Sequence, residues 1–256
     1  MTDAANTRRD ELLKEIGISP VWQLRDAPQA AVAPVEALAA REPDAPVTAL
    51  VPAVARGGAP GSVTGMDWPA LKACVAECRA CVLHQKRNKT VFGVGDENAD
   101  WLFIGEGPGA DEDAQGEPFV GQAGKLLDNM LAAIALQRGT NVYIANIVKC
   151  RPPGNRNPQP EEAEACSGYL QRQIELIQPK LIIALGKVAA VNLLGRDASI
   201  ASLRGQQHAW RGIPLLVTYH PAYLLRTLSD KAKAWEDLCF ALETMQRLQS
   251  AGTVAI

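Results

Sequence analysis

Four short apolar runs, separated by helix-length segments, constrain the fold of this chain more than any other feature. They lie at residues 100–106, 141–148, 180–185 and 213–219. Their apolar residues do not alternate with polar ones, which is typical of strands buried on both faces. Helical patterns occupy residues 122–136, 160–177, 186–194 and 229–248. This order predicts an α/β fold of three layers, with a four-stranded parallel sheet between helices.

The α/β pattern begins at Asp67, a helix N-cap, so we expect a core domain over residues 67–250. Between Ala27 and Gly65, 22 of 39 residues are Ala, Pro or Gly and none is aromatic, which predicts a flexible linker over residues 27–66. Residues 1–26 hold a short amphipathic segment that ends near Trp22. That segment is either a docking peptide or a tail that packs on its own domain.

Composition narrows the class of protein. Of the 256 residues, 47% are hydrophobic and 21% are charged, and the net charge is −2, as expected for a globular protein. The apolar runs are too short to span a bilayer, and the N-terminus has no apolar signal core, so we expect a cytoplasmic protein. Six cysteines without an export signal favour metal or redox chemistry over disulfides.

The polar residues that could carry chemistry follow the apolar runs. The first run leads into GEGPGADED, the second into NIVKCRPPGNRNP and the fourth into HPAYLLR. Because the carboxyl ends of parallel strands meet at one edge of a sheet, these loops should converge on one site. The first loop lacks a GxGxxG run and is acidic, which excludes a dinucleotide fingerprint.

Four cysteines have the spacing of a metal site. Cys78 and Cys81 form a CxxC pair, and Cys150 and Cys166 come from a distant loop and helix. Four thiolates can hold either zinc or a 4Fe-4S cluster, and the spacing does not decide between them. Cys74 and Cys239 have apolar neighbours and are predicted to be inert core thiols.

These motifs together resemble the family-4 uracil-DNA glycosylases, the iron–sulfur branch of the uracil-DNA glycosylase superfamily. The matching pieces are GEGPGADED, GEPFVGQAGKLLD, NIVKCRPPGNRNP, HPAYLLR and the four cysteines. The resemblance implies an α/β/α fold, excision of uracil from DNA and a 4Fe-4S cluster on Cys78, Cys81, Cys150 and Cys166. A uracil-binding iron–sulfur protein without turnover is the alternative, and a related covalent-trapping branch is disfavoured because no His follows Cys150 within RPPGNRNP.

The resemblance also implies site residues. Phe119 would stack on a flipped uracil, Asn146 would read its edge, and His220 would donate a hydrogen bond to uracil O2, with Glu106, Gly107 and Pro108 completing the pocket. Gly107 stands where other uracil glycosylases carry a water-activating Asp, so Glu106 and Glu112 are both candidates for that role. The expected DNA contacts are Lys149, Arg151, Arg226 and a wedge residue, Leu224.

The N-terminal segment has a resemblance of its own. Residues 8–25, RRDELLKEIGISPVWQLR, resemble the N-terminal peptide of the psi subunit of the bacterial replicative clamp loader. That resemblance implies a tether between the glycosylase domain and the clamp loader. We otherwise expect a monomer that works on the bacterial nucleoid.

Overall fold

The computed structural model describes residues 63–253. The docking peptide and most of the linker predicted before residue 67 lie outside this range. Residues 63–66, predicted as the end of the linker, are already part of the folded unit. The Met66 carbonyl accepts a hydrogen bond of 2.7 Å from Nε of Arg172, and Val63 and Met66 pack against the core. The folded unit therefore begins a few residues before Asp67.

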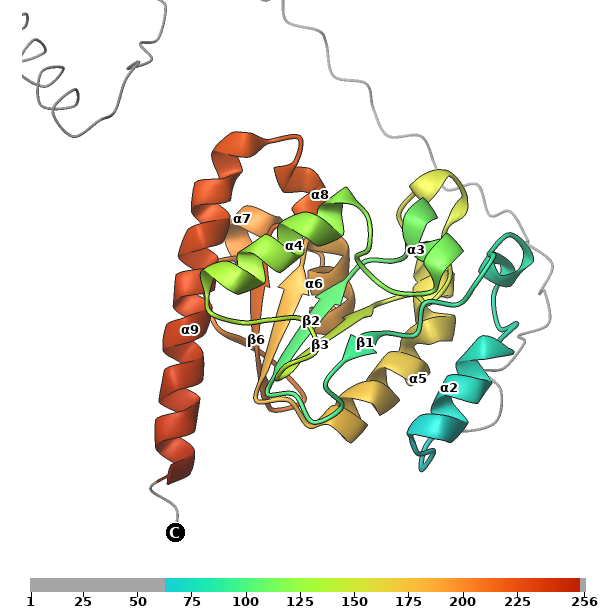
Figure 1. The fold of residues 1–256 in the computed structure, drawn as a ribbon, viewed down its shortest axis with the longest axis horizontal. Helices are drawn as coiled ribbons and strands as arrows, with labels where there is room; N and C mark the ends of the chain where they lie inside the picture. Colours follow the sequence, from blue (N-terminus) through green and yellow to red (C-terminus); the bar gives the residue numbers. More distant parts are fainter. Residues whose placement is uncertain (1–62, 254–256) are drawn as a thin grey trace, which may run out of the picture. The chain divides into compact units, whose positions relative to one another are not determined.

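A six-stranded sheet forms the centre of the fold (Figure 1), in the order β1-β3-β2-β4-β6-β5. Its four central strands are parallel, as predicted. They are β2 (Trp101–Gly105), β3 (Val142–Asn146), β4 (Leu181–Leu185) and β6 (Ile213–Thr218). The count of four was too low, because a short antiparallel strand pairs with each edge. These edge strands are β1 (Val94–Gly95) and β5 (His208–Trp210).

Helices cover both faces of the sheet and form a core on each. Successive residues of a buried strand point to opposite faces, so they pack into different cores. Leu102 and Ile104 pack into a core with α2, α5 and α6, whereas Phe103 packs into a second core with α4 and α9. The three-layer arrangement is visible in Figure 1. The bounds are α2 (Trp68–Ala76), α4 (Gln122–Ala133), α5 (Pro160–Ile177), α6 (Lys187–Leu194) and α9 (Lys231–Thr253).

Local capping explains where the main helices begin. The Asp67 carboxylate accepts a hydrogen bond from the amide of Ala70 at 3.0 Å, so α2 starts where predicted. Helix α5 has the predicted bounds, and the Glu162 carboxylate accepts a hydrogen bond from the amide of Gln159 at 2.8 Å. Helix α2 ends at Ala76, before the CxxC pair of Cys78 and Cys81.

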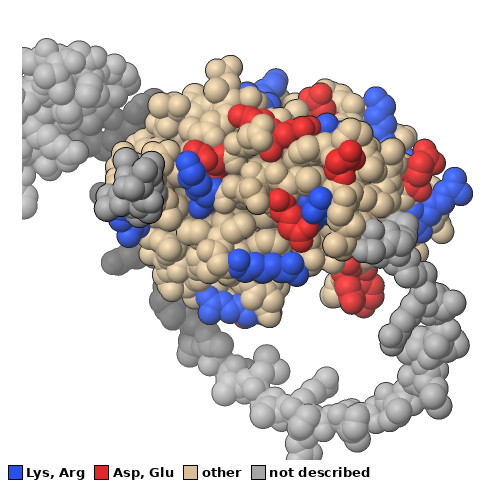
Figure 2. Space-filling view, turned by 90° about the horizontal axis from the view of Figure 1, so that it is seen from below, with Lys and Arg blue, Asp and Glu red and all other residues tan. Residues whose placement is uncertain are grey.

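Several short helices were not predicted, and they connect the main elements. They are η1 (Val82–Gln85), α3 (Ala110–Gln115), η2 (Pro153–Asn155), α7 (Ile200–Leu203), α8 (Pro221–Leu224) and η3 (Leu228–Asp230). Within the described range, no helix has the length and apolar character needed to cross a bilayer. The face shown in Figure 2 carries basic and acidic side chains next to one another, so it offers no broad basic surface to a phosphate backbone.

Candidate active site and cysteine cluster

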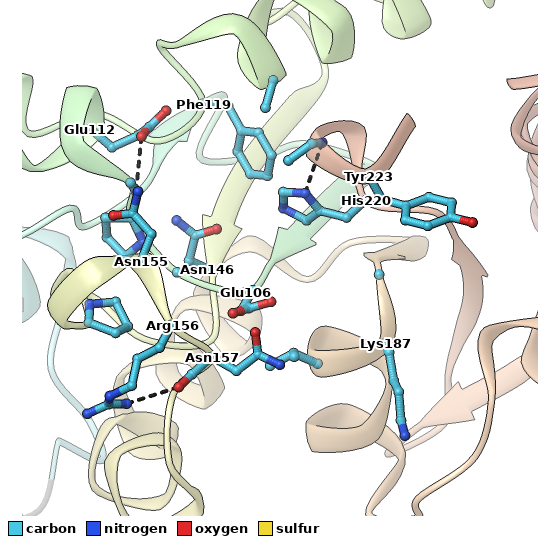
Figure 3. Close-up of a pocket in the computed structure, with 18 of the residues that line it drawn as sticks. Glu106, Glu112, Phe119, Asn146, Asn155, Arg156, Asn157, Lys187, His220 and Tyr223 are labelled. Atoms are coloured by element: carbon cyan, nitrogen blue, oxygen red, sulfur yellow. Dashed lines mark hydrogen bonds between the residues drawn. The ribbon is translucent and has the colours of Figure 1, made fainter. Parts of the chain in front are cut away.

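A cavity of about 460 Å³ lies at the carboxyl ends of the four parallel strands (Figure 3). The three polar loops predicted to converge all line it. A fourth segment, Gly186 and Lys187 after β4, also contributes. The main polar and aromatic side chains of the lining are Glu106, Glu112, Phe119, Asn146, Asn155, Arg156, Asn157, Lys187, His220, Tyr223 and Arg226. The cavity is thus the best candidate for the active site.

Asn146 ends strand β3 and points into this cavity. Its side chain is buried, with 2% of the residue exposed, yet Oδ1 has no hydrogen-bond partner among the described residues. A Cβ on Gly105, its neighbour in the sheet, would come within 2.6 Å of that oxygen and of the Phe119 ring. Because an unpaired buried acceptor is costly, the oxygen is suited to a ligand that donates a hydrogen bond.

Phe119 is held beside Asn146 by backbone contacts. Its φ is 56°, a left-handed value that is uncommon for a bulky residue. Arg138 stabilises this conformation by donating hydrogen bonds to the carbonyls of Pro118 and Phe119, at 2.9 and 2.8 Å. The Phe119 ring lies 5.5 Å from the His220 ring, centroid to centroid. The ring is therefore fixed at the wall of the cavity, where a planar ligand could stack on it.

His220 has a defined tautomer. Its Nδ1 accepts a hydrogen bond from the amide of Ala222 at 3.1 Å, so in the neutral ring the proton is on Nε2. Burial, helped by the positive charge of Arg226 and opposed by Glu112, lowers the pKa of His220 to about 4. Near neutral pH the imidazole is thus an uncharged hydrogen-bond donor at the cavity.

The two candidate acids differ sharply. Burial raises the pKa of Glu106, whose carboxylate points into the cavity and makes no hydrogen bond or ion pair within residues 63–253. The Glu112 carboxylate instead accepts hydrogen bonds from the amides of Gly109, Val120 and Gly121, at 3.0, 3.0 and 3.2 Å. Glu112 therefore joins two loops, and only Glu106 is free to act on a ligand.

Gly107 and Pro108 line the cavity next to Glu106, as expected. A Cβ on Gly107 would come within 2.7 Å of the Val148 side chain. An aspartate at this position would therefore displace the loop after β3. This packing disfavours any side chain larger than that of Gly107 at this place.

Two of the four expected DNA contacts are wrong. Lys149 is only 1% exposed, and its ammonium donates hydrogen bonds inside the protein rather than reaching the surface. Leu224 is also 1% exposed and packs with α4 and α9. The neighbouring Leu225, with 42% exposed, is available for contact instead. In the sequence HPAYLLR nothing distinguishes the two leucines, whereas the short helix α8 turns only one of them outward.

The other two expected DNA contacts lie near the cavity. Arg226 lines it and is exposed. Arg151 donates a hydrogen bond of 2.7 Å to Oδ1 of Asn155, a cavity residue that the sequence analysis did not single out. Asn157 was missed as well, although polar residues after the rigid Pro152–Pro153 pair were a usable signal. Arg156 and Glu162 fix this loop through two hydrogen bonds of 2.8 and 2.7 Å.

The four predicted cysteine ligands line a second, smaller cavity between η1, the loop after β3 and α5. Donors already face their sulfurs: Arg87 lies 3.1 Å from Sγ of Cys150, and the amide of Lys149 lies 3.3 Å from Sγ of Cys166. Burial raises the pKa of the Cys166 thiol to about 12 and also raises those of Cys150 and Cys81. These thiols would therefore need a bound cation to ionise.

The described residues contain no group of three or more His, Cys, Asp or Glu side chains that could hold a single metal ion. Cys74 lies close to the cysteine cavity, with its sulfur 3.8 Å from the hydroxyl of Tyr169, a residue that lines that cavity. Cys239 is on α9, away from it. Of the two cysteines predicted to be inert, only Cys239 is clearly remote from the four predicted ligands.

The family model of the uracil DNA glycosylase superfamily matches residues 92–239. A type-4 uracil-DNA glycosylase from Archaeoglobus fulgidus is 47% identical over 159 residues, which cover 59% of this chain and 79% of the relative. The corresponding protein from Thermotoga maritima is 45% identical over 62% of this chain and 83% of its own length. A third type-4 uracil-DNA glycosylase, from Pyrobaculum aerophilum, is 41% identical over 68% of this chain and 92% of its own length. The chain belongs to the uracil-DNA glycosylase superfamily and, within it, to the type-4 family.

Proposed function

We propose that the protein is a DNA-repair glycosylase that cleaves the N-glycosidic bond of uracil in DNA and leaves an abasic site. The observation that carries this proposal is the buried, unpaired Oδ1 of Asn146 beside Phe119 and His220. The type-4 relatives, which are named for this activity, support the choice of substrate. Because the cavity is recessed, the base must leave the duplex to enter it.

Recognition of the base follows from the Asn146 amide. Uracil presents a donor at N3 and an acceptor at O4, which match the Oδ1 acceptor and the Nδ2 donor of Asn146. Cytosine presents the opposite pattern, so it would leave both pairs mismatched. Phe119 provides a flat surface for either ring, and discrimination therefore rests on Asn146.

Bond cleavage uses the neutral His220 and Glu106. As the C1′–N1 bond breaks, its electron pair leaves with uracil, and the Nε2–H of His220 donates to O2, where negative charge develops. A preorganised donor of this kind contributes about 3 kcal/mol to transition-state stabilisation. Glu106 orients a water, whose oxygen bonds to C1′ and whose proton passes to the carboxylate. The products are an abasic sugar and the uracil anion, which becomes free uracil when it takes up the proton released by the water.

We assign the DNA contacts to residues around the mouth of the cavity. Arg226 and Arg151 supply positive charge for backbone phosphates. Leu225 takes the wedge role first expected for Leu224, because a wedge has to be exposed before it can enter the base stack.

We propose that Cys78, Cys81, Cys150 and Cys166 hold a 4Fe-4S cluster. All four line one cavity, and hydrogen-bond donors face two of the buried sulfurs, as is usual around iron–sulfur thiolates. When bound, the cluster supplies a cross-link between the CxxC segment, the loop after β3 and helix α5. The hydrolytic roles remain with Glu106, Asn146 and His220.

The test is incubation with an oligonucleotide that contains one uracil, followed by alkali to cleave abasic sites. Cytosine and thymine oligonucleotides are the substrate controls. Asn146→Ala and His220→Ala should each lose about two orders of magnitude or more in rate while remaining folded. Asn192→Ala and His208→Ala, outside the cavity, are the matched controls. Binding of uracil-DNA without strand cleavage would instead support the alternative of a binding protein without turnover.

We also propose that residues 8–25, which lie outside the described residues, bind the replicative clamp loader. This contact would keep the enzyme at the nucleoid. We propose that the enzyme itself is a monomer. The support is the resemblance to the psi peptide and an apolar set that includes Leu12, Leu13, Ile16 and Trp22. Residues 1–30 fused to a carrier should retain clamp-loader subunits in a pull-down, and Trp22→Ala should not. Equal behaviour of both fusions would remove this part of the proposal.

A further inference from the structure

Lys149 is a buried cation without an acidic partner. Its ammonium donates hydrogen bonds to the carbonyl of Asn146 at 3.0 Å and to Oε1 of Gln173 at 2.6 Å. Neither acceptor is charged, and within the described residues no carboxylate pairs with it. A buried ammonium is expensive, so a specific interaction has to offset its cost.

Lys149 also lines the cysteine cavity. The main-chain amide of Lys149 donates to Sγ of Cys166, and Cys150 is the next residue in the chain. The lysine therefore lies between the four cysteines and the end of strand β3.

The other side of Lys149 holds the uracil-reading residue. The carbonyl that accepts from its ammonium belongs to Asn146, whose side chain carries the unpaired Oδ1 in the active-site cavity. Gln173, the second acceptor, donates through Nε2 to the carbonyl of Phe92 at 3.0 Å. Lys149 thus ties the last residue of β3 to helix α5 and to the segment that precedes β1.

We propose that Lys149 is a positioning residue that fixes Asn146 for reading uracil and, through the hydrogen bond from its main-chain amide to Sγ of Cys166, links that residue to the cysteine cavity. The inference rests on the proposed role of Asn146. It assigns a buried lysine to the same reaction without any contact between that lysine and DNA. A small displacement of a binding group lowers the rate strongly, so one hydrogen bond to the Asn146 carbonyl is enough to matter.

The experiment compares three variants of the cluster-loaded full chain. Lys149→Met keeps most of the length of the side chain but removes the charge and both hydrogen bonds. Gln173→Met leaves Lys149 in place and removes one of its acceptors, which also covers the case in which Lys149→Met does not fold. Lys180→Met is the matched control, because Lys180 is half exposed just before β4 and, among residues 63–253, its ammonium forms an ion pair with Asp100 alone.

We expect Lys149→Met to lower kcat for uracil excision about tenfold or more with KM changed less than about threefold, and Gln173→Met to give a smaller loss of the same kind. Visible absorbance and iron content should stay at the wild-type level. Amide hydrogen exchange at residues 142–149 should become faster in both variants and stay unchanged in Lys180→Met.

Wild-type kcat and wild-type exchange in Lys149→Met would overturn the proposal. Loss of iron would also overturn it, since Lys149 would then serve the cluster alone. A rise in KM with unchanged kcat would make Lys149 a phosphate contact after all. If the wild-type protein itself excises no uracil, the proposed function fails, while the exchange measurement still tests whether Lys149 fixes the end of β3.

Discussion

Glu106 and Glu112 have the same side chain and opposite surroundings, which separates their roles. Glu106 is partly buried, unpaired and aimed into the cavity, whereas Glu112 accepts three backbone hydrogen bonds. We predict that Glu106→Gln lowers the single-turnover rate of uracil excision about a hundredfold, with an unchanged melting temperature.

Glu112→Gln should show the reverse pattern. The amide cannot accept all three hydrogen bonds, so the free energy of unfolding should fall by about 1–3 kcal/mol with a smaller effect on rate. Denaturant unfolding and the rate measurement on both variants decide the assignment. A stable Glu112→Gln protein with a hundredfold lower rate would move the water-orienting role to Glu112.

The lowered pKa of His220 predicts that the free energy of unfolding depends on pH. Its pKa is about 4 in the folded protein and near 6.5 when unfolded, so the unfolded chain binds the proton first as pH falls. The neutral, buried His220 therefore contributes to the free energy of unfolding at pH values above its pKa in the unfolded chain, and this contribution is lost as the pH falls toward 4. Between pH 7 and pH 5 it amounts to about 2 kcal/mol. In denaturant unfolding, His220→Gln should therefore lose less stability over this interval than the wild-type protein, and equal losses would contradict the assigned burial.

Asn146 and His220 stood out in the sequence because each follows a buried strand, whereas Phe119 and the roles of all three residues came from the resemblance to a known family. A position after a strand does not show where a side chain points once the strand has ended. Lys149 follows the same strand and looks like a surface lysine, but it turns inward to a carbonyl three residues earlier. Leu224 and Leu225 present the same difficulty, because their directions are set by a helix of only four residues.

That short helix, α8, allows a paired test. Leu224→Ala removes a core side chain packed against α4 and α9, so it should lower the free energy of unfolding by about 2–5 kcal/mol. Leu225→Ala should keep wild-type stability and instead weaken excision from double-stranded more than from single-stranded uracil-DNA. Thermal unfolding and excision rates on the two substrates distinguish these outcomes. Equal defects on both substrates would exclude Leu225 as the wedge.

The parallel strands were predictable because each is a continuous apolar run that both cores bury. The edge strands β1 and β5 have two and three residues, which is too short to show any periodicity. The last helix continues to Thr253 rather than ending at residue 248, since no Gly or Pro interrupts the pattern before Gly252. Long buried elements were thus accessible to sequence analysis, and short connecting ones were not.

The four cysteines join segments that are far apart in the chain, so their loss should affect the protein as a unit. We predict that Cys150→Ser, purified under low oxygen, loses visible iron–sulfur absorbance and becomes less stable to heat, whereas Cys239→Ser retains both properties. Iron and zinc analysis of the wild-type protein identifies the cofactor. A colourless wild-type protein with stoichiometric zinc would contradict the cluster assignment.

The recessed position of Asn146, Phe119 and His220 also limits which parts of the DNA these residues can contact. All three line the same cavity, and in the proposed mechanism they contact the flipped base alone. In the proposed mechanism the pair has to open before these three residues can act, so the stability of the pair adds to the energetic cost of excision, whatever help the wedge residue gives. The stability of the pair that holds a lesion therefore contributes to how fast the lesion is repaired.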